Sequence, residues 1–235
     1  MALTPDTTES FAREVDENLR RDQARDLARK YGKWLVGGLI LFLVAVAAFL
    51  YWKDRQTKQA EASTEQLVGI LQDVDGPKAA TVPARLDALR SDDADGVRAS
   101  AGFARAALAL QRGDRKLAST VYAQLAADDG LPKSYRDLAT VRGAMVDYDS
   151  LKPDEVIARL QPLAVAGQPF HGSAGEMIGM ALIAKGQRPA AAQLFARIAA
   201  DKSVPDSLRS RAVQVAGTLG LDASASLPTG TPTEQ

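Results

Sequence analysis

The 235-residue chain carries 29 basic and 29 acidic residues, a single histidine and no cysteine. Without cysteine it can form no disulfide, no thiolate nucleophile and no cysteine-based metal site. The part of the chain after Trp52 is also balanced, with 22 basic and 22 acidic residues. A region without net charge lacks the basic surface that nucleic-acid binding requires, and its length of about 180 residues suffices for a folded domain with its own core.

Residues 1–33 are predicted to form a short arm that contains a helix. Phe11, Val15 and Leu19 recur four residues apart, as on one face of a helix that begins near Ser10. Basic residues gather toward the end of the arm: Arg20, Arg21, Arg25, Arg29, Lys30 and Lys33. The simpler interpretation is that they set the orientation of a following membrane span, and docking onto a cytoplasmic partner is the alternative.

Residues 34–52 form an apolar run without a single charge, bounded by Lys33 and Lys53. A helix of this length, at about 1.5 Å per residue, covers roughly 28 Å and matches the ~30 Å hydrocarbon core of a bilayer. Trp34 and Trp52 stand at its two ends, where aromatic rings suit the membrane interfaces. The run therefore predicts one transmembrane helix. A buried core helix fits less well, and so does a cleaved signal peptide, whose apolar core is shorter.

The distribution of basic residues predicts the orientation of the span. Six stand in the arm just before it, and three come soon after it: Lys53, Arg55 and Lys58. Because basic residues are retained on the cytoplasmic side, the arm is expected inside the cell and residues 53–235 across the membrane.

Residues 53–96 are predicted to hold a linker and the first helices of the exported domain. Helical periodicity continues to Leu71 and stops near Gly76 and Pro77, where a loop is expected. A short helix is predicted from Pro83 to Arg90, and residues 91–96 are expected to form another loop.

Two segments farther along the chain are similar to one another. Residues 101–139 align with residues 174–212 without a gap, at an offset of 73 residues, and 13 of the 39 positions are identical. This offset is close to twice the 34-residue period of a helix–turn–helix repeat. The pattern predicts an all-α solenoid of helical hairpins over residues 97–220, with an intervening hairpin within residues 139–165. Residues 221–235 have no apolar periodicity and are predicted to form a disordered tail.

Four matched pairs mark the two similar segments. Each segment has a helix-ending glycine, a small residue in its second helix, an aromatic residue expected to fill space between hairpins, and a proline near the next helix. The pairs are Gly113 and Gly186, Ala118 and Ala191, Tyr122 and Phe195, and Pro132 and Pro205. This pattern resembles the tetratricopeptide repeat (TPR), although Gly102 and Gly175 stand near the position of its usual tryptophan. An unrelated helical bundle is the alternative.

A search for chemistry yields no catalytic, cofactor-binding or metal-binding residue. His171 has no second histidine or cysteine with which to hold a metal. Ser173 and Glu176 have the spacing of a capping box, so the segment around His171 is interpreted as a loop that leads into a helix capped at Ser173. Arg136 and Arg209 match across the repeat, and they either bind a partner's carboxylate or make salt bridges within the domain.

The layout as a whole resembles the ancillary subunits of the SecYEG translocon that carry a periplasmic TPR-like domain. The resemblance covers about residues 11–217, and rests on the arm, the span, the helix that contains residues 98–106, Gly113-Asp114 and the alanine-rich helix after them. It implies a single-pass inner-membrane protein with a cytoplasmic N-terminus and a periplasmic C-terminal domain. Its implied partners are the translocon and periplasmic chaperones, with no enzymatic activity, cofactor, nucleic acid or small-molecule substrate.

Other functions are open at this point. A TPR-type assembly factor for another envelope complex, such as cytochrome c maturation, would share the same architecture. An envelope enzyme that uses His171 and a tether that only oligomerises are further alternatives.

Overall fold

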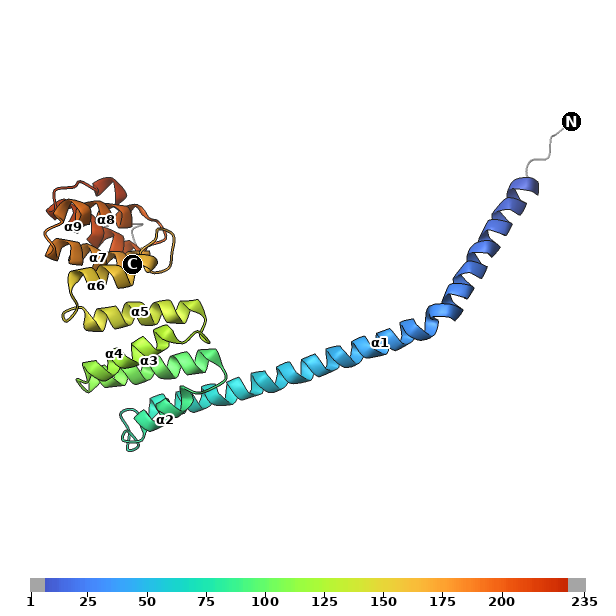
Figure 1. Cartoon of the computed structure of the whole chain (residues 1–235), viewed down its shortest axis with the longest axis horizontal. Coiled ribbons are helices and arrows are strands. Elements are labelled where there is room, and N and C mark those ends of the chain that lie inside the picture. Colours follow the sequence, from blue (N-terminus) through green and yellow to red (C-terminus); the bar gives the residue numbers. More distant parts are fainter. Residues whose placement is uncertain (1–6, 228–235) are drawn as a thin grey trace, which may run out of the picture. The chain divides into compact units, whose positions relative to one another are not determined.

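The computed structural model describes residues 7–227, with side chains from Lys30 onward except those of Gly32 and Leu35. This part of the chain contains helices and turns but no strand, which confirms the predicted all-α class (Figure 1). In chain order the elements are α1 (Thr7–Gln72), α2 (Val82–Leu89), α3 (Asp95–Gln111), α4 (Arg115–Ala127), α5 (Lys133–Asp147), α6 (Pro153–Leu160), the 3-10 helix η1 (Gln161–Leu163), α7 (His171–Ala184), α8 (Arg188–Ala200), α9 (Asp206–Thr218) and the 3-10 helix η2 (Ser224–Ser226).

The chain divides into two units, residues 1–59 and 60–235. The first unit holds most of α1, whose segment Val36–Gln72 contains an 18-residue window of mean hydropathy 2.0 with none of its surface buried. A helix that exposes apolar side chains on every side needs an apolar medium around it, and this one is long enough to cross a membrane. Lys30 and Lys33 are exposed on it. For Arg20, Arg21, Arg25 and Arg29 the structure describes the helical backbone but not the side chains.

The second unit is a stack of antiparallel helices with a core that runs along it. The C-terminal end of α1 packs with α2 and α3 through Leu67, Ile70 and Leu86. Helices α3 to α5 enclose a second cluster around Val121 and Tyr122, and helices α5 to α9 enclose a third. Each cluster fills the space between neighbouring hairpins, so burial passes from one hairpin to the next as in a solenoid.

The two similar sequence segments fold into equivalent hairpins. Helix α8 begins and ends 73 residues after the corresponding ends of α4. The first residue of α9 likewise lies 73 residues after the first residue of α5. Gly113 and Gly186 end the first helices with φ of 79° and 76°, a conformation that glycine adopts without strain. Pro132 and Pro205 stand at the N-caps of α5 and α9.

Small residues in the first helix of each hairpin face large residues in the second. A Cβ added at Gly102 would lie 2.7 Å from Leu125 Cδ2, and one added at Gly175 would lie 2.8 Å from Ile198 Cδ1. The first helix thus lacks a side chain where the second helix presses against it. This contact accounts for glycine near the position where a tetratricopeptide repeat usually has tryptophan.

The other matched residues are buried at the same interfaces. Ala118 and Ala191 are fully buried in α4 and α8. Tyr122 contacts the ring of Phe103 in α3, with 6.1 Å between ring centroids, and also lies against Gly143 of α5. Phe195 lies against Gly179 of its own hairpin. Tyr122 therefore packs within its hairpin and also against the next helix, and Phe195 packs within its hairpin.

The intervening hairpin consists of α5 and the short helix α6. α6 begins at Pro153, and Glu155 Oε2 accepts a hydrogen bond from the Lys152 N–H at 2.8 Å, which caps the helix. With only eight residues α6 is shorter than α4 and α8, and it packs mainly against α7 rather than α5.

Two predictions near the C-terminus need correction. Helix α7 begins at His171, so Ser173 lies inside the helix, and Glu176 forms a salt bridge with Arg211 instead of a capping box. Of the predicted disordered tail, residues 221–227 lie against the domain through η2 and the buried Ala223 rather than lacking structure, and residues 228–235 lie outside the described residues. In both places contacts from distant residues decide the conformation, and the local pattern does not contain them.

The close contact at Gly179 yields a test of the hairpin geometry. A Cβ at this position would lie 2.5 Å from Cε2 of the buried Phe195, so Gly179→Ala is expected to lower the free energy of unfolding by about 1–3 kcal/mol. Gly217→Ala is the matched control, because the space around that helical glycine is open, and a gain of about 0.5–1 kcal/mol is expected. Urea unfolding followed by circular dichroism measures both. Equal effects of the two substitutions would contradict the packing described.

Candidate protein-binding surface

Each of the two similar hairpins has a basic residue near the start of its first helix that contacts an aspartate just after its second helix. Arg98 Nε lies 3.3 Å from Asp128 Oδ2, and His171 Nδ1 lies 2.7 Å from Asp201 Oδ2. Both residues of the second pair stand 73 positions after those of the first. His171 is therefore the structural counterpart of Arg98. Comparing the sequence at this offset could have suggested it, but the change of residue type concealed the match.

The surroundings of His171 do not form a nucleophilic site. The ring is buried, with 2% of the residue exposed. Ser203 Oγ donates to Asp201 Oδ1 at 2.6 Å, on the far side of the carboxylate from the imidazole. In a catalytic triad the serine hydroxyl is hydrogen-bonded to the histidine, whereas here it is hydrogen-bonded to the aspartate. These three residues therefore do not have the arrangement of a triad. Among the described residues no cluster of three or more histidine, cysteine, aspartate or glutamate side chains is placed to hold a metal.

Hydrogen bonds stabilise the charged form of Asp201. The Ser203 hydroxyl contributes most, followed by the N–H groups of Gly167 and Ser203 and then by His171, and together they hold the pKa of this carboxyl well below its usual range. The carboxylate thereby joins the loop before α7 to the loop after α8.

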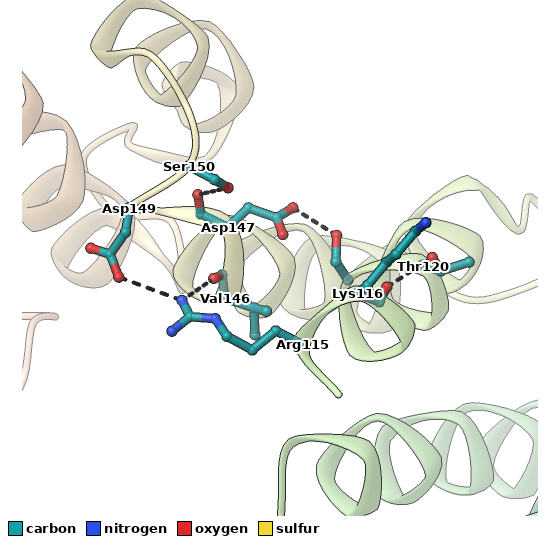
Figure 2. Close-up of a pocket in the computed structure, with 8 residues that line it drawn as sticks. Arg115, Lys116, Thr120, Val146, Asp147, Asp149 and Ser150 are labelled. Carbon is teal, nitrogen blue, oxygen red and sulfur yellow. Dashed lines mark hydrogen bonds and ion pairs between the residues drawn. The ribbon is translucent and has the colours of Figure 1, made fainter. Parts of the chain in front are cut away.

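The described surface has an open groove between α4 and α5. One end is a cleft of about 520 Å³ (Figure 2). It is lined by Arg115, Lys116, Ser119, Thr120, Val146, Asp147, Asp149 and Ser150. The other is a hollow of about 370 Å³ with a largely alanine floor. It is lined by Ser119, Tyr122, Ala123, Ala126, Ala127, Ala139, Thr140, Gly143, Asp147 and Arg159. Because the two share Ser119 and Asp147, they form one depression, called here the α4/α5 groove.

Polar contacts fix the middle of the α4/α5 groove. Asp147 Oδ2 accepts hydrogen bonds from Ser119 Oγ at 2.8 Å and Arg159 Nη1 at 3.2 Å, which joins α4, α5 and α6. At the cleft, Arg115 Nη2 donates to the carbonyl oxygen of Val146 at 2.6 Å and lies 3.5 Å from Asp149 Oδ2 (Figure 2). The groove thus combines an apolar floor with charged and hydroxyl groups among its lining residues, and such a surface is suited to a polypeptide segment.

Arg136 and Arg209 occupy equivalent positions but differ in their contacts. Arg209 Nε donates to the Ala199 carbonyl at 2.9 Å and Nη2 to the Ser226 carbonyl at 3.1 Å, so it binds groups within its own domain. Arg136 Nη1 donates to Asp129 Oδ1 at 2.8 Å, while its buried Nε has no hydrogen-bond partner. For Arg209 these contacts favour the structural alternative, whereas Arg136 keeps an unused donor.

Residues 26–216 match the family model described as Tetratricopeptide repeat-like domain. The chain belongs to this family. In this TPR-like protein, the residues that match the family model include the apolar segment of α1 as well as the helical hairpins. Searches of the curated proteins and of the solved structures give no match. Repeat domains of this kind stack hairpins to form extended surfaces for protein partners.

The depressed pKa of Asp201 yields a pH-dependent prediction. Because folding lowers this pKa, the charged carboxylate stabilises the folded state above its ordinary pKa of 3.8, and this stabilisation is lost as the pH falls below that value. Asp201→Asn is therefore expected to lower the urea midpoint at pH 7, with a difference from wild type that shrinks below pH 4. Asp93→Asn, at an exposed loop position, is the control and should match wild type throughout. A difference between Asp201→Asn and wild type that is independent of pH would contradict this account.

Proposed function

We propose that this TPR-like protein is a membrane-anchored protein-interaction module with its N-terminal arm in the cytoplasm and its helical repeats in the periplasm. One observation carries the proposal: the family match spans both the exposed apolar segment of α1 and the hairpins after it. This joint match supports an anchor and an interaction domain that act as one unit.

The charge distribution supports the orientation. Six basic residues lie between Arg20 and Lys33, just before the span, and three come soon after it, which favours retention of the arm on the cytoplasmic side of an inner membrane. Anchoring would raise the local concentration of the repeats near other membrane proteins, so that contacts of modest affinity suffice for association.

Within this module, the specific role we propose is that of an ancillary subunit of the SecYEG translocon that links protein export to periplasmic chaperones. Its support is the resemblance in layout, from the arm through the span to the glycine-terminated hairpins. The open α4/α5 groove also suits such a role, because newly exported polypeptides and chaperone segments present main-chain groups that its donors can bind.

The orientation is tested by cysteine labelling. The wild-type chain has no cysteine, so each introduced thiol reports without background. In intact spheroplasts a membrane-impermeant maleimide is expected to label Ser207→Cys, which lies at an exposed position of α9, and to leave Ser10→Cys unlabelled until the cells are lysed. Val44→Cys, inside the apolar run, is the control that should resist labelling in both conditions. Labelling of Ser10→Cys before lysis would reverse the proposed orientation.

The translocon role is tested by cross-linking in native membranes, followed by purification in mild detergent and mass spectrometry. Translocon subunits are expected to be enriched with the full chain. A matched control chain that keeps the span but lacks residues 97–220 is expected not to enrich them. Enrichment of cytochrome c maturation components without translocon subunits would favour the assembly-factor alternative and contradict the specific role.

A further inference from the structure

The groove between α8 and α9 is filled by the chain's own residues 221–227. η2 contacts both helices, and Ala223 belongs to the same buried cluster as Phe195 and Val213. Arg209 Nη2 donates to the Ser226 carbonyl near the start of α9, while Leu221 N–H donates to the Ala216 carbonyl near its end. The segment therefore runs along the length of α9 with a small side chain turned inward and a carbonyl held by arginine.

The α4/α5 groove is the equivalent position in the first of the two similar segments, and no residues of the described chain cover it in this way. Four residues that line it, Ser119, Ala123, Ala126 and Thr140, are more accessible than their counterparts 73 positions later. Ala126 is half-buried where Ala199 is fully buried, and Ala123 is exposed where Ala196 is half-buried. The reason lies in the connection, because the chain after α5 turns into α6 and packs mainly against α7.

The arginine that holds the tail in one groove has its counterpart beside the other. Arg209 is 12% exposed and uses both Nε and Nη2 on main-chain carbonyls. Arg136 is 33% exposed, and its Nε is buried without a hydrogen-bond partner. An unused buried donor is costly, and an incoming segment that lets the guanidinium reorient would relieve that cost.

We propose that the α4/α5 groove binds a short segment of a partner polypeptide in the way that the α8/α9 groove binds residues 221–227, which include the 3-10 helix η2. An alanine or serine side chain of the segment lies against Ala126, and a main-chain carbonyl accepts a hydrogen bond from Arg136. Ser119 and Thr140 stand where the filled groove has Ala192 and Val213, so the partner segment carries hydroxyl or amide groups that match them. This inference rests on the proposed interaction function and names the surface that performs it.

The tail of a second copy is a less suitable occupant, because each tail is already bound to its own α8 and α9. Its sequence is nevertheless a direct probe of the groove, since it shows which kind of segment such a groove accepts. The experiment measures fluorescence anisotropy of a labelled synthetic peptide with the sequence of residues 220–227, titrated with the full chain in detergent.

Two substitutions fill the α4/α5 groove at exposed positions of α4, where folding tolerates a larger side chain. Ala123→Trp and Ala127→Trp are each expected to weaken peptide binding at least tenfold, and Arg136→Ala at least threefold. Ala190→Trp, at an exposed position of α8 outside both grooves, is the matched control and should bind within twofold of wild type. Circular dichroism melting of each variant establishes that it is folded.

Three results would overturn the proposal. One is the absence of peptide binding up to about 1 mM, which corresponds to about 4 kcal/mol of binding free energy. Another is binding that Ala123→Trp and Ala127→Trp leave unchanged, which would place the peptide elsewhere, including on α8 and α9. The third is a dimer of the full chain that these substitutions dissociate, which would put a second copy in the groove. If partners still co-purify while the peptide fails, only this surface is wrong; if the peptide binds but no partner co-purifies, the proposed function fails instead.

Discussion

The repeat domain depends on the close approach of the two helices in each hairpin. Gly102 and Gly175 leave the backbone of the first helix uncovered, and the branched side chains of Leu125 and Ile198 pack directly against it. Closely packed apolar atoms gain dispersion energy only at short range, so even one added methyl group at these points would separate the helices.

One structural unit is used twice, and the two copies differ in the path that the chain takes after each of them. After α5 the chain leaves for α6, whereas after α9 it returns as residues 221–227 and covers the last groove. A solenoid has to close its terminal hydrophobic surface, which the tail does for the last hairpin. The internal groove has no such requirement, because the hairpins on either side already bury the core. It can therefore stay open to a partner.

Much of this architecture could be predicted because it depends on the spacing of residues along the sequence. The 73-residue offset gave the hairpins, and Gly113 and Gly186 gave the ends of their first helices. The predicted capping box at Ser173 was wrong because α7 begins earlier, at His171. Asp201 binds both Gly167 in the loop before α7, 34 residues away, and His171, 30 residues away. The equivalence of Arg98 and His171 was missed because the two residues are of different types. What they share is a contact with an aspartate, which is visible only in the structure.

The α4/α5 groove itself was beyond the reach of sequence patterns. Its floor consists of alanines that also serve helix packing, and its openness results from where α6 goes rather than from any motif. The order of residues 221–227 was hidden for a similar reason. A segment rich in alanine and serine has no periodicity of its own, and its conformation comes from the helices beneath it.

The central claim is that the two hairpins are equivalent and that a bound segment covers only the second of them. Amide hydrogen exchange, compared between the full chain and a chain ending at Gly220, tests this claim most directly. The account predicts faster exchange in α8 and α9 after truncation, approaching the rates in α4 and α5, with α3 to α5 unchanged. Unchanged exchange in α8 and α9 would contradict it.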